Sequence, residues 1–83
     1  MNPIFVVQVD IDNVLDITRT EKAFKENGLL TRTSYVDHLS KSITWEYVTE
    51  RAAKERVLAI KDYLRTKPWR QRKNFTVSLV EEN

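Results

Sequence analysis

Apolar and polar positions alternate along four stretches of the chain. In the stretch 4–11 (IFVVQVDI) both alternating sets begin with apolar residues and β-branched side chains dominate, which predicts a central β-strand. The stretches 29–37, 42–48 and 74–82 are rich in Thr, Val, Tyr and Phe, so we expect three further strands there. The polar segment HLSKS between the second and third of these predicts a turn.

Apolar residues recur at helical spacing in the two remaining stretches. The segment 12–13 (Asp-Asn) offers N-cap side chains, and Val14, Ile17 and Phe24 then follow one helical face. Asn27 and Gly28, the only glycine of the chain, predict the end of this first helix, because glycine adopts the left-handed C′ conformation without a steric penalty.

A second helix is predicted from about residue 50 to 66. It ends before Pro68, because the residue that precedes a proline is disfavoured in helical dihedrals. Its apolar stripe consists of four residues at i, i+4, i+7 and i+11: Ala53, Val57, Ile60 and Leu64. The order strand–helix–strand–strand–helix–strand predicts an α+β fold of the ferredoxin-like type, a βαββαβ arrangement with two helices on one face of a four-stranded antiparallel sheet. Residues 1–83 are expected to form this single domain.

Trp45 and Tyr47 have two interpretations within this fold. If they point away from the helices, they form a stacking platform for single-stranded bases, and IFVVQV resembles the first strand of RNA-recognition motifs. That arrangement turns Gln8 into the apolar core, where an unpaired amide is costly, so the sequence favours Trp45 and Tyr47 as core residues. The opposite face of the sheet is then half apolar, and a homodimer that packs sheet against sheet or through edge strands would cover it. This outer face is predicted to present Ile4, Val6, Gln8, Asp10, Thr44, Glu46, Val48, Thr76, Ser78 and Val80.

Composition narrows the class of protein. The chain has no cysteine, which excludes disulfides and thiolate metal sites and is typical of a cytoplasmic protein. The stretch MNPIFVVQVD has no basic residue before a short apolar run, so we expect neither a signal peptide nor a membrane span.

The charge is unevenly distributed along the chain. The net charge is only +2, but residues 1–40 carry four basic and six acidic side chains, whereas residues 41–83 carry ten basic and six acidic ones. This asymmetry favours an anionic partner at the C-terminal half. The candidate nucleic-acid contacts lie in RTKPWRQRKNF: Arg65, Lys67, Trp69, Arg70, Arg72 and Lys73. Arg65 and Lys67 also complement the negative end of the second helix, which leaves Arg70, Arg72 and Lys73 without a structural explanation.

Few residues offer catalytic chemistry. His38 beside Asp37 is a candidate general base, although a lone His in a polar turn is more often simply exposed. Asp10 and Asp12, at the end of the first strand, are candidates for a Mg²⁺ site, and Asp10 is also a candidate catalytic residue. The alternative is that Asp12 or Asn13 caps the first helix, and that Asp16 interacts favourably with the positive end of its first turn. No other cofactor is expected, and a single glycine excludes a glycine-rich phosphate loop.

Four features together resemble a group of small ferredoxin-like proteins: a first strand ending in Asp10 (VVQVDID), a helix ending FKENGL, the segment RTSYV, and a last strand after a basic connection. The group contains the small nucleases of CRISPR adaptation, the VapD ribonucleases and the GhoS-type antitoxins. The resemblance implies a homodimer, RNA or DNA binding, and Asp10 at the nuclease metal position.

Two functional hypotheses follow. The first is a small dimeric regulatory domain that binds nucleic acid, in particular RNA, as a component of a toxin–antitoxin or phage-defence system. The second is a protein-interaction module, such as a phage-type inhibitor of a host protein, without nucleic-acid contact. A third hypothesis, Mg²⁺-dependent cleavage of RNA, would rest on Asp10.

Overall fold

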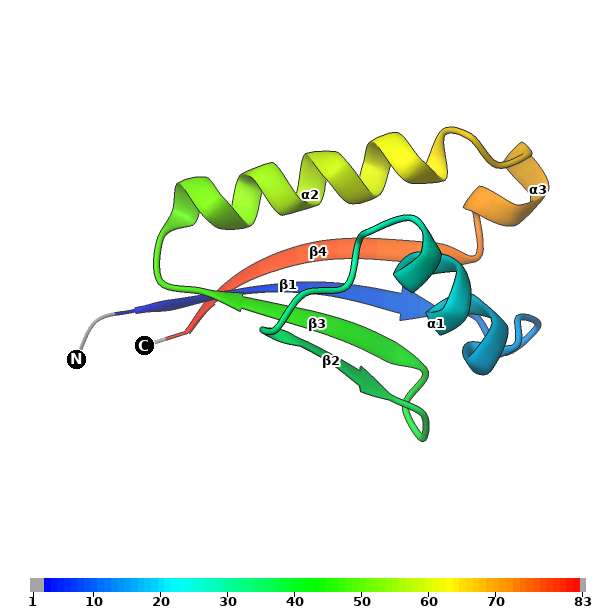
Figure 1. The fold of residues 1–83 in the computed structure, drawn as a ribbon, viewed down its shortest axis with the longest axis horizontal. Coiled ribbons are helices and arrows are strands. Elements are labelled where there is room, and N and C mark those ends of the chain that lie inside the picture. Colours follow the sequence, from blue (N-terminus) through cyan, green and yellow to red (C-terminus); the bar gives the residue numbers. More distant parts are fainter. Residues whose placement is uncertain (1–2, 83) are drawn as a thin grey trace.

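The computed structural model describes residues 3–82, and its strands and two long helices follow the predicted order (Figure 1). The α+β prediction is confirmed. The elements are β1 (Ile4–Ile11), α1 (Ile17–Glu26), β2 (Ser34–Asp37), β3 (Ser42–Tyr47), α2 (Glu50–Leu64), the short helix α3 (Trp69–Arg72) and β4 (Phe75–Glu82).

The four strands form one antiparallel sheet in the order β2-β3-β1-β4. Helices α1 and α2 both lie on the same face of this sheet, which is a ferredoxin-like layout (Figure 1). The register places Val7 between Trp45 on β3 and Leu79 on β4, all on the helix-covered face. Because side chains alternate along a strand, the intervening residues form an open face, which no helix among residues 3–82 covers.

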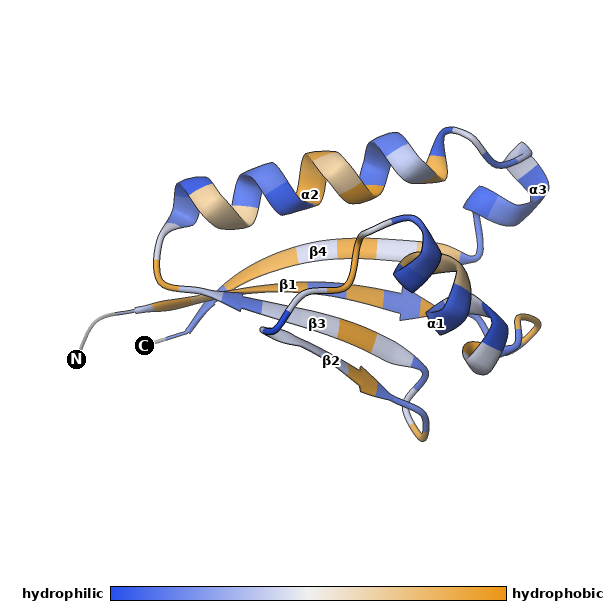
Figure 2. Ribbon diagram, viewed as in Figure 1, coloured by the Kyte–Doolittle hydropathy of each residue, from blue (hydrophilic) through white to orange (hydrophobic). Residues whose placement is uncertain are grey.

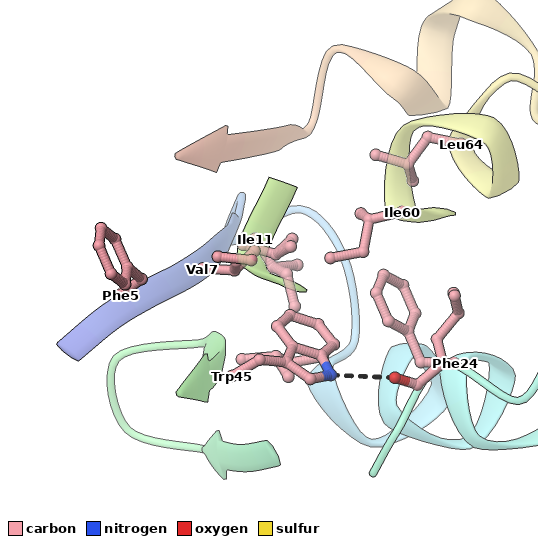
Figure 3. Close-up of a cluster of buried hydrophobic side chains, with 11 residues drawn as sticks. Phe5, Val7, Ile11, Phe24, Trp45, Ile60 and Leu64 are labelled. Atoms are coloured by element: carbon pink, nitrogen blue, oxygen red, sulfur yellow. Dashed lines mark hydrogen bonds between the residues drawn. The ribbon is translucent and has the colours of Figure 1, made fainter. Parts of the chain in front are cut away.

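The hydrophobic core lies between the helices and the sheet. Trp45 is fully buried, and its indole N–H donates to the Leu29 carbonyl oxygen at 2.9 Å, so the one polar atom of this ring is satisfied (Figure 3). Tyr47 packs against the same core and is partly buried. The core interpretation of both side chains is therefore confirmed. Figure 2 shows the most hydrophobic part of α2 in the middle of the helix, with hydrophilic segments on both sides of it.

The first helix begins one turn later than the sequence predicted. Asp16, not the segment 12–13, is its N-cap, and its Oδ1 accepts from the backbone N–H groups of Thr18 and Arg19 at 2.8 and 3.3 Å. The Asp12 carboxylate instead accepts from the Val14 N–H at 3.0 Å and closes a local turn. Asp12 and Asp16 lie four residues apart and are both suitable N-caps, and the predicted N-cap in the segment 12–13 is wrong.

Lys41 holds the connection between β1 and α1 in place. Its Nζ donates to the Asn13 carbonyl oxygen at 3.2 Å and to that of Leu15, although these residues are far apart in the sequence. Lys41 itself has a φ of 54°, a left-handed conformation that is uncommon for a residue with a side chain. This long-range clamp explains why the chain leaves β1 in a loop before the helix starts.

The second strand is shorter than predicted. Gly28 has a φ of 70° and ends α1 as expected, after which the Leu29 N–H donates to the Phe24 carbonyl oxygen at 2.9 Å. Thr31 and Ser34 then exchange two hydrogen bonds, Thr31 N–H to Ser34 Oγ at 3.0 Å and Ser34 Oγ–H to the Thr31 carbonyl oxygen at 2.6 Å. Residues 29–33 therefore form a cap and a turn, and only Ser34–Asp37 pairs with β3.

The second helix ends at Leu64, close to the predicted boundary, and the short helix α3 was not predicted. Pro68 starts this single turn, where its missing N–H is not required, and its carbonyl oxygen accepts from the Gln71 N–H at 2.9 Å. Within residues 3–82, no helix has the length and apolar character needed to cross a membrane.

Candidate nucleic-acid interface

The connection between α2 and β4 presents its side chains to solvent. Helix α3 is one turn long and buries no residue, so Trp69, Arg70 and Arg72 are all exposed. The indole of Trp69 is 67% exposed, which is uncommon for so large an apolar side chain. The Trp69 ring therefore does not pack into the core and is available for stacking.

Three cations next to α3 already have partners within the chain. Arg65 Nη1 lies 2.8 Å from Asp62 Oδ1 in an exposed ion pair. Lys67 Nζ lies over the Tyr63 ring, 5.1 Å from its centroid. Lys73 Nζ lies over Trp69 in the same way, at 5.6 Å. The two ring contacts neutralise no charge, so both ammonium groups still attract an anion.

Arg70 and Arg72 form no ion pair within the described part of the chain, residues 3–82. No acidic residue occurs between Asp62 and Glu81. Their charges, together with that of Lys73, are therefore not compensated by nearby sequence. The structure brings the predicted contacts of α3 together around Trp69, while Arg65 is largely occupied by Asp62.

The two carboxylates predicted for Mg²⁺ have different tasks. Asp10 lies on the open face, where its Oδ1 accepts from Gln8 Nε2 at 2.8 Å. Asp12 accepts from the Val14 N–H, as described above. No group of three or more His, Asp or Glu side chains suited to a metal ion occurs among residues 3–82. Mg²⁺ is commonly held by one or two carboxylates together with waters and phosphate oxygens, so a site at Asp10 and Asp12 stays a prediction.

His38 is not oriented by Asp37. Its Nε2 lies 3.0 Å from Glu21 Oε1 on α1, at a surface position. Asp37 Oδ1 instead accepts from the backbone N–H groups of Leu39 and Ser40 at 3.0 and 3.2 Å. The Ser40 hydrogen bonds, first of all the one from its backbone N–H, lower the pKa of Asp37. The predicted pairing of His38 with Asp37 does not form: the carboxylate beside His38 is that of Glu21, and Asp37 caps the turn.

The open face of the sheet carries apolar side chains among polar ones. Ile4, Tyr35 and Val80 are exposed there, and Val6 lies between Glu46 and Val80 in the strand register. Tyr35 was not among the residues predicted for this face. Its place there follows from its pairing with Thr44 on β3. Polar residues such as Gln8 interrupt the apolar ones, so the surface is not one continuous hydrophobic patch.

A groove of about 430 Å³, which the sequence analysis did not predict, lies between α1 and the end of α2. Its aromatic surface comes from Phe24, Tyr63 and Phe75, and Lys67 lies beside it. Only the spacing of polar and small residues on α1 could have indicated it. The full set of lining residues is Val14, Leu15, Asp16, Arg19, Thr20, Ala23, Phe24, Tyr63, Lys67, Gln71 and Phe75.

Comparisons of the chain with protein-family models, with curated proteins and with solved structures found no match.

Proposed function

We propose that this protein is a small homodimeric regulatory domain that binds single-stranded RNA through α3 and its flanking residues. The observation that supports this most directly is the group of Arg70, Arg72 and Lys73 around the exposed Trp69, without a neutralising carboxylate. A structural role explains none of these three charges. Exposed cations beside an exposed aromatic ring are the combination that binds a flexible, single-stranded phosphate backbone.

The two kinds of side chain supply different parts of the binding free energy. Each arginine or lysine that contacts a phosphate releases a condensed counterion, and this term does not depend on sequence. Trp69 offers a flat ring on which a base stacks, a contact that contributes about 1–3 kcal/mol for each base in single-strand binders. Lys73 lies over this ring and would turn toward a phosphate when a base takes its place.

The salt dependence of binding tests the proposal. Three phosphate contacts to a single strand predict a slope of about −2 in log K against log salt, which is a loss of about 20-fold in affinity between 50 and 200 mM salt. The measurement is a fluorescence-anisotropy titration of a labelled single-stranded RNA of mixed sequence, with DNA of the same sequence and duplex RNA as comparisons. Absent binding, or binding that salt does not change, would contradict the proposal.

The homodimer is proposed to form through β4. This strand is an edge of the sheet and has eight residues, whereas the other edge, β2, has four. A long exposed edge has unpaired backbone N–H and C=O groups that a second copy can complete. Its ends have opposite charge, with Arg72 and Lys73 before the strand and Glu81 and Glu82 at its end, so an antiparallel copy brings unlike charges together.

A two-fold axis through Ser78, close to the middle of β4, keeps both faces of the sheet continuous. Val77 then lies opposite Leu79 of the second copy on the helix-covered face, and Thr76 lies opposite Val80 on the open face. Val77 and Leu79 are only partly buried in the single chain, so this pairing would cover apolar surface that the helices leave accessible.

Substitutions on the open face distinguish this dimer from a sheet-against-sheet dimer. Ser78→Lys places two lysines opposite each other at the axis and is expected to raise the dimer dissociation constant about tenfold, because like charges directly opposite are destabilising. An equal mixture of Ser78→Lys and Ser78→Glu should restore the dimer. Thr44→Lys, on the same face but on the inner strand β3, is the matched control. Analytical ultracentrifugation gives the constants. A dimer that Thr44→Lys breaks and Ser78→Lys does not would refute pairing through β4.

A second candidate function, a protein-interaction module, is favoured by the exposed Ile4, Tyr35 and Val80 on the open face. A photo-crosslinking residue at position 35 tests it in a nuclease-treated extract. A specific protein adduct that forms there, and that the substitution Val80→Glu prevents, would support this function. An adduct formed only between copies of this chain would instead support sheet-against-sheet dimers.

A further inference from the structure

The groove between α1 and α2 exists because one stripe of α1 is polar and small. Asp16, Thr20 and Ala23 recur at helical spacing along this stripe, and all three line the groove. A helix that packs closely against a neighbouring helix normally presents larger apolar residues there. The stripe therefore leaves a space of about 430 Å³, which lies within the size range of small-ligand sites.

Two partly buried aromatic rings form the inner surface of the groove. Phe75 stacks on the fully buried Phe24 with ring centroids 6.2 Å apart and an interplanar angle of 29°. Tyr63 meets Phe24 edge-on, at 5.3 Å and 76°. Because Phe24 is fixed in the core, both rings are held in place, and each exposes part of its surface to the groove. Such a surface suits a flat, aromatic ligand.

The rim of the groove is cationic. Lys67 Nζ lies over the Tyr63 ring, and Arg19 lines the groove from α1. Neither forms an ion pair within residues 3–82. One acid, Asp16, also lines the groove, and its Oδ1 is occupied by two backbone N–H groups, which leaves Oδ2 as an acceptor. A ligand that fits has an aromatic ring, an anionic group and a donor of hydrogen bonds.

From these contacts we infer that the groove binds one unstacked nucleotide of the RNA strand, which deepens the proposed function and rests on it. The base stacks against Phe75 and Tyr63, its phosphate contacts Lys67 and Arg19, and an exocyclic amine donates to Asp16. Gln71 belongs to both regions, since it lines the groove and lies between the cations of α3. The strand therefore continues from the groove onto Arg70 and Arg72.

The test uses AMP, UMP and ribose 5-phosphate as probes of the ¹⁵N-labelled protein in NMR titrations. We expect saturable shifts of the backbone amides of Thr20, Ala23 and Gln71 with AMP, weaker binding of UMP, which has no exocyclic amine, and little with ribose 5-phosphate. Ala23→Leu fills the groove and should abolish the AMP shifts and reduce the affinity for single-stranded RNA about tenfold. Thr18→Leu, on an exposed position of the same helix, is the matched control and should change neither.

A second variant does not depend on how the groove repacks. Lys67→Gln removes the phosphate contact without a change in core volume and should weaken AMP about tenfold, the usual scale for a hydrogen bond to a charged group. Equal shifts with ribose 5-phosphate and AMP would overturn the inference, because they indicate an adventitious phosphate. Wild-type RNA affinity in Ala23→Leu would overturn it while the proposed function stands. AMP binding without any RNA binding would overturn both this inference and the proposed function. The groove would then be a site for free nucleotides.

Discussion

Two connections lie at the same end of the sheet and use their charges differently. They are in direct contact, since the Asp12 N–H of the β1–α1 connection donates to the Asn74 carbonyl oxygen of the α2–β4 connection at 2.9 Å. In the first, Asp12, Asp16 and the clamping Lys41 each bind backbone groups of the same chain. In the second, Arg70 and Arg72 have no such partner among residues 3–82. Charged side chains that bind backbone groups of the same chain stabilise the fold, whereas charged side chains without such contacts are available to a partner.

Removing the exposed charges should have the largest effect of all, on RNA affinity, and almost no effect on stability. The variant Arg70→Gln/Arg72→Gln/Lys73→Gln is expected to lose about 100-fold in RNA affinity at 0.1 M salt, because three counterion-releasing contacts disappear. Its free energy of unfolding should change by less than about 0.5 kcal/mol, the usual range for surface substitutions. Anisotropy titrations and urea denaturation measure the two quantities. A parallel loss of stability would mean that these side chains support the fold after all.

Removing the hydrogen bonds of Lys41 should lower the stability of the protein and leave its RNA affinity almost unchanged. Lys41→Met keeps the aliphatic stem and removes the donor to the Asn13 and Leu15 carbonyl oxygens, so we expect a loss of about 2 kcal/mol in the free energy of unfolding. Lys54→Met, which breaks only an exposed pair with Glu50, is the control and should cost less than about 0.5 kcal/mol. RNA affinity should stay within about twofold of wild type, apart from the loss of one distant charge.

The N-cap of α1 should contribute less than the clamp. Asp16→Ala leaves the Thr18 and Arg19 N–H groups without their acceptor and is expected to lower the free energy of unfolding by about 1 kcal/mol. Asp16→Asn should recover most of this loss, because asparagine is an equally good cap. If Asp12→Ala were the more damaging substitution in urea denaturation, the assignment of the cap to Asp16 would be wrong.

The smallest expected effect is the contribution of Asp37 to the loss of stability at low pH. Hydrogen bonds from Ser40 hold the pKa of Asp37 below its ordinary value, so its contribution to stability is present above the unfolded pKa of about 4 and is lost as the pH falls through the folded value. Asp37→Asn should therefore flatten the decline in stability below about pH 4 and leave neutral pH almost unchanged. Urea midpoints between about pH 2.5 and 6 would show this. If the urea midpoint of Asp37→Asn fell with pH as steeply as that of the wild type, Asp37 would not contribute to the loss of stability in acid.

The parts of the fold that depend on local patterns were predictable. The β-branched residues of 4–11 identified the strand, the polar Gln8 identified its outer face, and Gly28 marked the end of α1. The start of α1 was not, because Asp12 and Asp16 are equally good caps in isolation. Lys41 donates to two carbonyl oxygens between these caps, and this long-range contact is not visible in the local sequence.

The candidate site was predictable in its charges but not in its shape. The run of cations before β4 is visible in the sequence, whereas α3 is a single turn with no apolar spacing to indicate it. The groove was missed because its parts come from α1, α2 and β4 and meet only in the tertiary structure. The partner of His38 was missed for the same reason, since Glu21 lies on a different element.

The two tryptophans give the protein two separate optical reporters. Trp45 is fully buried beside Phe24, whereas Trp69 is 67% exposed on α3. The emission of Trp45 should lie at shorter wavelength, resist quenching by acrylamide and change only when the chain unfolds. The emission of Trp69 should lie at longer wavelength, be quenched readily and respond when a base stacks on it. Unfolding and RNA binding can therefore be followed independently in the unlabelled protein, with Trp69→Phe to assign the two signals.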